Sequence, residues 1–235
     1  MERSIVRKIF LVLSLIAIPI GFYFAFVYAP VEKTMGMVQK IFYWHVPSAW
    51  MAFLGFFIVF GCSLFYLWLK EARIARLALA AAEIGFLFTT IVLLTGPLWA
   101  KPVWGVWWSW DPRLTTTLLL WFIYFAYLVL DRFFDDPSRV TRYRAVLGII
   151  GSLDIPLIHV SVLWWRTLHP KPVVLSSEGL GSGLYPTMLH ALEVNGMVFL
   201  IIFITLLLYR MEAERLKEQI REQQRSKEPS WTLTS

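Results

Sequence analysis

The chain contains six long apolar stretches, each about as long as a lipid bilayer is thick. Hydrocarbon about 30 Å thick needs roughly 20 helical residues at about 1.5 Å each. The stretches cover residues 9–29, 47–69, 77–98, 114–130, 145–165 and 189–209. Only helices and closed barrels satisfy the backbone in lipid, and runs this continuous are helical. The sequence therefore predicts an all-α polytopic membrane protein with six transmembrane helices.

The distribution of Lys and Arg predicts the orientation of these helices, because basic residues stay preferentially on the cytoplasmic side. With a cytoplasmic N-terminus, only a few of the 22 basic residues lie in outer segments, namely Lys33, Lys40, Lys101, Arg113, Arg166 and Lys171. We therefore expect both termini in the cytoplasm and the connection between the third and fourth helices on the periplasmic side. Residues 1–209 are the predicted membrane domain, and residues 210–235 are a charged cytoplasmic tail.

Charge and cysteine content exclude two classes of function. The net charge of +6 follows from the basic residues on the inner side, so we expect no nucleic-acid partner. Cys62 is the single cysteine, which rules out an internal disulfide. The chain has no Cys-x-x-Cys-His run and therefore does not attach haem c to itself.

Tryptophans gather in the connection after the third stretch, where residues 104–113 read WGVWWSWDPR. The indoles are Trp104, Trp107, Trp108 and Trp110. Aromatic belts at membrane interfaces account for one or two of them, but a cluster in one loop favours a platform for a flat conjugated ring. Asp111 can cap the next helix and Pro112 fits its first position. Arg113 would stay near the surface and could pair with an anionic group.

Two histidines lie at the outer rims of different helices. His45 precedes Pro47 at the mouth of the second helix, and His169 lies just past the fifth. Imidazoles approaching one object from two sides are what a six-coordinate haem iron requires, although a lone interfacial histidine is usually only a polar tip. The N-terminal ends of the second, fourth and sixth helices, each the positive end of a helix dipole, would converge on this face. With Lys101, Arg113 and Arg166, they would attract the two carboxylates of haem.

His159 and His190 are weaker candidates that we expect beside the ligands rather than on the iron. His159 lies about 9 Å inside its helix, which suits a hydrogen-bonded partner within the bundle. His190 is three residues before Glu193, so those two side chains could pair. Further polar residues fall within the apolar stretches, namely Glu83, Asp154, Glu193 and Asn195. Structural pairing is their default interpretation, and a polar route for cargo or protons is the alternative.

Three segments of the chain resemble the CcmC family of cytochrome c biogenesis. Residues 104–115, WGVWWSWDPRLT, are similar to its tryptophan-rich WWD signature. Residues 43–49, YWHVPSA, and 158–169, IHVSVLWWRTLH, resemble its two histidine segments, and the chain length and six stretches also agree. Pro112 stands where we would expect alanine, and Asp154 is acidic where we would expect a neutral residue, so no role is assigned to Asp154.

The resemblance implies properties that spacing alone does not give. In that family the two outer histidines, here His45 and His169, ligate haem iron, and the WWD loop packs on the ring. The cargo, non-covalently bound haem b, is loaded onto the periplasmic chaperone CcmE beside the ABC-transporter subunits CcmA and CcmB and the small CcmD. The expected location is the bacterial inner membrane. Related WWD proteins that act as haem lyases, CcmF and CcsA, are larger and have more spans.

The sequence thus predicts a haem-presenting membrane protein and not an enzyme. Its expected site comprises His45 and His169 on the iron, the four indoles and Asp111 around the ring, and Arg113 or Arg166 on the propionates. A membrane cytochrome b is one rival, although such proteins usually place histidines within facing helices. A proton-coupled permease using Glu83, Asp154 and Glu193 is another. A zinc enzyme is disfavoured, because the outer histidines have no adjacent acid–base partner.

Overall fold

A computed structural model describes residues 2–165, 167–169, 175–176, 179–180 and 183–227. Within them, six helical segments are long and apolar enough to cross a membrane, which confirms the predicted all-α class and the six spans. The α-helices are α1 (Glu2–Tyr23), α2 (Phe42–Leu69), α3 (Ala72–Trp104), α4 (Pro112–Val129), α5 (Pro137–Gly151), α6 (Asp154–Trp164) and α7 (Pro186–Lys227). A short hairpin of β1 (Leu175–Ser176) and β2 (Gly179–Leu180) lies between α6 and α7.

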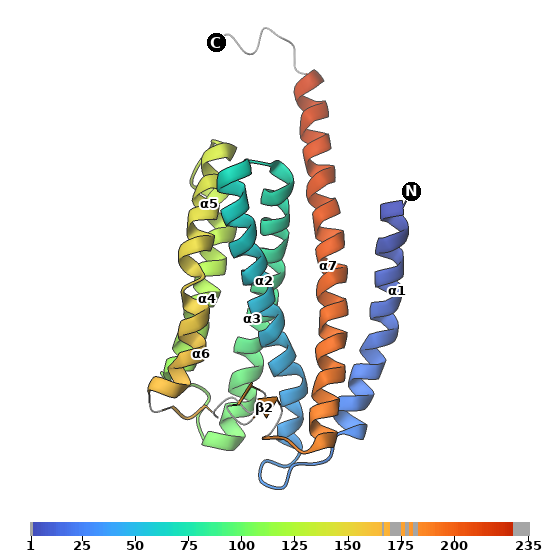
Figure 1. Ribbon diagram of the computed structural model, residues 1–235, viewed down its shortest axis with the longest axis vertical. Helices are drawn as coiled ribbons and strands as arrows, with labels where there is room; N and C mark the ends of the chain where they lie inside the picture. The colour runs from blue at the N-terminus through green and yellow to red at the C-terminus, as the bar shows by residue number, and fades with distance from the viewer. Residues whose placement is uncertain (1, 166, 170–174, 177–178, 181–182, 228–235) are drawn as a thin grey trace.

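Shorter helical turns extend three of the spans. A π-helical turn, Phe24–Tyr28, continues α1, and the 3₁₀ turns Met37–Ile41 and Leu130–Arg132 precede α2 and follow α4. The helices run side by side, α1 beginning and α7 ending at the same end of the bundle (Figure 1). The connection from α3 to α4 lies at the other end, which we call the loop end.

The fifth span is not the single helix that the apolar pattern predicts over 145–165. It starts earlier, at Pro137, and consists of α5 and α6 separated by a break at Ser152 and Leu153. Pro156 explains the break, because it has no N–H to donate to the carbonyl of Ser152, and its ring would clash with that carbonyl in a continuous helix. The Ser152 carbonyl instead accepts from the Ile155 amide at 3.4 Å, and the Ser152 hydroxyl donates to the carbonyl of Ile149 at 2.6 Å.

Helices α2 and α3 form the centre of the bundle and pack along most of their length. Gly55 of α2 allows this close approach, because a Cβ there would lie 3.0 Å from the Ala81 carbonyl oxygen of α3. Gly85 of α3 makes room for α4 in the same way: its Cβ would lie only 2.0 Å from the hydroxyl oxygen of Tyr124. That buried tyrosine of α4 donates a hydrogen bond to the carbonyl of Ala52 in α2 at 2.7 Å. One hydroxyl thus joins three helices, so the packing depends on glycine at position 85.

Helix α7 is the longest element and extends beyond the other helices (Figure 1). Ion pairs hold its C-terminal half against the rest of the chain. Arg210 pairs with Glu83 of α3 and with Glu214, Glu212 with Arg7 of α1, and Glu218 with Arg76 of α3. Because Glu83 is satisfied in this way, it has the structural role that is the default for an acid within a span.

Candidate functional site

The tryptophan segment, residues 104–111, begins where α3 ends. Trp104 is the last residue of α3, and Gly105 follows with φ +76°, a left-handed conformation that favours glycine. The Gly105 amide donates to the Lys101 carbonyl at 3.0 Å, and Lys101 Nζ donates to the Gly105 carbonyl at 2.9 Å. Lys101 is therefore bonded to the end of its own helix. This cap turns the chain away from α3 and starts the loop.

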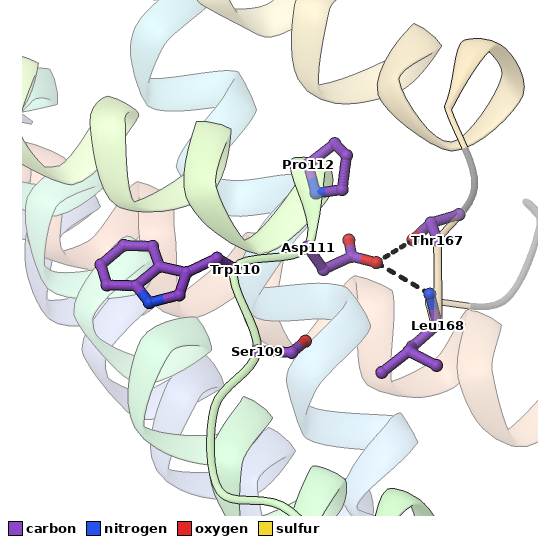
Figure 2. Close-up of a pocket in the computed structure, with 6 residues that line it drawn as sticks. All are labelled: Ser109, Trp110, Asp111, Pro112, Thr167 and Leu168. Atoms are coloured by element: carbon purple, nitrogen blue, oxygen red, sulfur yellow. Dashed lines mark hydrogen bonds between the residues drawn. The ribbon is translucent and has the colours of Figure 1, made fainter.

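Asp111 ends the tryptophan segment as the predicted N-cap. Its Oδ1 accepts a hydrogen bond from the Arg113 amide at 2.9 Å, and Pro112 occupies the first position of α4. Its other oxygen has a role that the sequence did not indicate. Oδ2 accepts hydrogen bonds from the Thr167 hydroxyl and, at 2.8 Å, from the Leu168 amide (Figure 2). One buried carboxylate thus starts α4 and fastens the segment that follows α6.

These bonds bring His169 to the tryptophan segment. The Thr167 hydroxyl oxygen also accepts from the His169 amide at 3.0 Å, so Asp111, Thr167 and His169 form one chain of hydrogen bonds. The His169 ring faces Trp104 edge-on, with 6.4 Å between ring centroids. A cavity of about 400 Å³ lies between the two segments, lined by Ser109, Trp110, Asp111, Pro112, Thr167 and Leu168 (Figure 2).

The hydrogen bonds at Asp111 also determine its ionisation. Burial alone would raise the pKa of its carboxyl, but the bonds from Thr167, Leu168 and Arg113 outweigh burial and lower the pKa below its ordinary value of 3.8. Asp111 is therefore a carboxylate at neutral pH. Its hydrogen bonds to the 167–168 segment are charge-assisted and stronger than bonds between neutral groups.

His45 lies in the first turn of α2, half-buried, on the side that faces α3. The helix begins at Phe42, five residues before the predicted start at 47, so His45 belongs to the helix instead of its mouth. Its Nδ1 is 2.8 Å from the hydroxyl oxygen of Thr95, and its ring is edge-on to Trp99 with 5.8 Å between centroids. Thr95 and Trp99 were missed as site residues. The signal in the sequence was their spacing of four residues, which places both side chains on the same face of α3.

The site brings together four of the residues that the sequence singled out. His45 lies close enough to His169 and Arg113 to interact with both electrostatically, and Asp111 interacts in the same way with His169 and Arg113. These side chains come from α2, the end of the tryptophan segment, the first turn of α4 and the segment after α6. They form a cluster of two imidazoles, a guanidinium and a carboxylate at the loop end.

The indoles do not form one flat sheet. Trp108 and Trp110 meet edge-on at an interplanar angle of 83°. Trp107 and Trp110 are 56% and 76% exposed, so each presents a broad aromatic surface to whatever lies beside the loop end. Trp104 is half-buried beside His169. Trp108 is half-buried as well, so two of the four rings are partly covered and two are exposed.

The remaining histidines lie elsewhere than expected. His159 is exposed on α6 and has no hydrogen-bond partner within the described chain, so the predicted partner in the bundle is wrong. His190 does not pair with Glu193: its Nδ1 is 3.2 Å from the Tyr28 hydroxyl, and its ring packs edge-on against Phe24. It joins α7 to the end of the first span. Arg166, the second predicted propionate partner, lies outside the described residues.

The other polar residues within spans differ in environment. Asn195 is fully buried and donates to the Ala191 carbonyl at 2.9 Å, a bond within α7 itself. Asp154 is buried at the start of α6, and neither carboxylate oxygen has a hydrogen-bond partner among the described residues. Glu193 is exposed on α7. Asp154 and Glu193 therefore do not follow the default of structural pairing.

Comparison with known proteins identifies the family. The family model described as CcmC, heme exporter protein C, matches residues 2–226. Heme exporter protein C of Bradyrhizobium diazoefficiens is 39% identical over 208 residues, 88% of this chain and 78% of the relative. That of Escherichia coli strain K12 is 37% identical over 199 residues, 84% and 79% of the two chains. That of Haemophilus influenzae is 34% identical over 206 residues, 87% and 83%. The chain therefore belongs to the heme exporter protein C family.

Proposed function

We propose that this protein binds haem as cargo at its loop end and delivers it for cytochrome c assembly, with His45 and His169 as the two axial ligands. The family assignment supports haem as the cargo. The observation that carries the site is that His45 of α2 and His169 of the segment after α6 lie close enough to interact electrostatically. Two imidazoles from separate segments suit an iron that accepts one ligand on each side.

The rest of the site fits the shape and charge of the cargo. Haem b is a flat apolar ring with two carboxylates at one edge. Trp104 and Trp99 stand beside the two histidines as aromatic walls, and Trp107, Trp108 and Trp110 offer further ring surfaces. Arg113 interacts electrostatically with His45 and would pair with a propionate, with Arg166 as a second candidate. Asp111 would not contact the ring and would instead hold the segment that carries His169 in place.

The proposed topology places the loop end in the periplasm and both termini in the cytoplasm, in a bacterial inner membrane. The concentration of Lys and Arg in the other connections supports this orientation. A haem held at the loop end would then be open to a periplasmic acceptor. We assign that part to the chaperone CcmE, and CcmA, CcmB and CcmD to the surrounding complex. Residues 1–209 would hold the cargo, and the charged tail, 210–235, would lie in the cytoplasm.

The ligand assignment is tested with the purified full chain from haem-replete cells. The parent protein should show the absorption and paramagnetic resonance spectra of low-spin, bis-histidine ferric haem. His45→Ala and His169→Ala should each lose that signature, and the double variant should retain little haem. His190→Ala is the matched control, since His190 contacts Tyr28 and Phe24 and not the proposed ligands. An unchanged low-spin spectrum in the double variant would remove both histidines as ligands.

A further inference from the structure

Thr95 of α3 makes the hydrogen bond that orients His45. Its Oγ1 lies 2.7 Å from the carbonyl oxygen of Ile91, 3.4 Å from that of Val92 and 2.8 Å from His45 Nδ1. A hydroxyl has one proton, and a carbonyl oxygen has none to donate. Two oxygens 2.7 Å apart therefore need the threonine proton between them. That proton is used within α3.

This arrangement fixes the position of the proton on the histidine ring. Because Thr95 has already donated its proton to α3, it can only accept at its contact with His45. The Nδ1 atom of His45 must then carry a hydrogen. In a neutral imidazole the second nitrogen, Nε2, is left with a lone pair. That lone pair is the form in which an imidazole binds a metal.

We infer that Thr95 is a positioning residue that selects the Nδ1–H form of His45 and so presents Nε2 to the haem iron. The inference rests on the proposed function, in which His45 is an axial ligand. Neighbouring residues of α3 support it. Trp99, one turn further on, meets the ring edge-on at 5.8 Å, and a Cβ at Gly96 would lie 3.6 Å from its Cε1 atom. The ring is therefore held against α3 as well as hydrogen-bonded to it.

The hydrogen bond also has an electronic consequence. An acceptor on Nδ1–H increases the electron density of the imidazole and makes Nε2 a more basic ligand. A more basic axial ligand favours ferric over ferrous iron. Thr95 should therefore strengthen ferric haem binding and lower the midpoint potential of the bound haem. A residue that only filled space would not affect the potential in this way.

Substitutions at position 95 separate the hydrogen bond from packing. Thr95→Val keeps the branched shape without the hydroxyl, and Thr95→Ser keeps the hydroxyl. Thr89→Val is the matched control, because Thr89 Oγ1 makes the same bond to a carbonyl of α3, that of Gly85 at 2.7 Å. We expect Thr95→Val to weaken ferric haem binding about 10- to 100-fold and to raise the midpoint potential. Thr95→Ser and Thr89→Val should stay close to the parent protein.

Parallel measurement of His45→Ala distinguishes the two possible failures. If His45→Ala loses the low-spin signature while Thr95→Val matches Thr89→Val in affinity and potential, the positioning role is overturned and the ligand assignment stands. If His45→Ala itself keeps the parent spectrum, the proposed function fails first. If Thr95→Val does not give a monodisperse protein, Thr95→Ala takes its place. A haem affinity and a midpoint potential of Thr95→Ala equal to those of the parent protein would again overturn the positioning role of Thr95.

Discussion

Asp111→Asn should weaken haem binding by releasing the segment that carries His169. The asparagine keeps one carbonyl oxygen, which can still accept from the Arg113 amide and cap α4. Its amide nitrogen would replace the oxygen that accepts from the Thr167 hydroxyl and the Leu168 amide. The Leu168 amide would then face a donor and lose its hydrogen bond, and the Thr167 hydroxyl would lose the charge-assisted bond that it donates, because it could only accept from the new amide.

The magnitude follows from the number and type of these bonds. A hydrogen bond to a charged group contributes about 1.5–3 kcal/mol. Taking the lower limit for the bonds from Thr167 and Leu168, because the cavity beside them opens to solvent, gives about 3 kcal/mol. If the whole loss falls on the step that presents His169 to the iron, binding weakens by up to about 100-fold. Part of the loss will appear as lower stability of the haem-free protein, so the measured change should lie below this limit.

The assay is a ferric haem titration of detergent-solubilised protein, followed by the low-spin absorption band. Asp136→Asn is the matched control, since Asp136 also caps a helix ahead of a proline and accepts from the Ser138 amide at 2.9 Å. It should bind haem like the parent protein. Asp111→Asn combined with His169→Ala should be no weaker than His169→Ala alone. Equal affinity of Asp111→Asn and Asp136→Asn would refute the role of Asp111 in holding His169.

Three further predictions concern pH, packing and charge. The pKa of Asp111 in the folded protein lies below its ordinary value of 3.8. Its contribution to the free energy of unfolding is therefore complete above pH 3.8 and is lost as the pH falls through the folded pKa. Asp111→Asn should remove this acid-dependent step from melting temperatures measured over a series of pH values. Gly85→Ala should destabilise the bundle by about 1–3 kcal/mol in the same assay, because the added Cβ would lie 2.0 Å from a tyrosine hydroxyl of α4, whereas Gly61→Ala, with open space around it, should not. Arg210→Ala should lower the melting temperature more than Arg210→Ala combined with Glu83→Gln, because the single change leaves an unpaired acid within a span.

The number and the approximate position of the spans could be predicted because hydrocarbon imposes one requirement on every crossing segment, although the second and fifth spans start earlier than predicted. The cap at Asp111 could also be predicted, since it depends only on residues next to it in the chain. The break before α6 was available in the sequence as Pro156, but the apolar pattern continues through it and concealed it. Hydropathy indicates whether a segment lies in the membrane, and it does not indicate whether the helix is continuous there.

The site was harder to predict where it depends on rotation about a helix axis. Thr95 faces His45 and His159 faces outward because of how α3 and α6 are turned. That rotation is determined by contacts between distant segments, such as Gly85 against Tyr124. No local pattern encodes such contacts. The second role of Asp111 has the same origin, since its partners lie more than fifty residues further along the chain.

The length of α7 has a mechanical consequence. Its 42 residues make a rod about 63 Å long, roughly twice the thickness of the hydrocarbon. Near its start, Ala191 and Leu192 pack in one cluster with Tyr43, two residues before His45, and its far half is tied to α3 by Glu218. A tilt of about 5° around the middle would move each end by roughly 3 Å in opposite directions. A tilt of α7 would therefore displace the residues that pack against the first turn of α2.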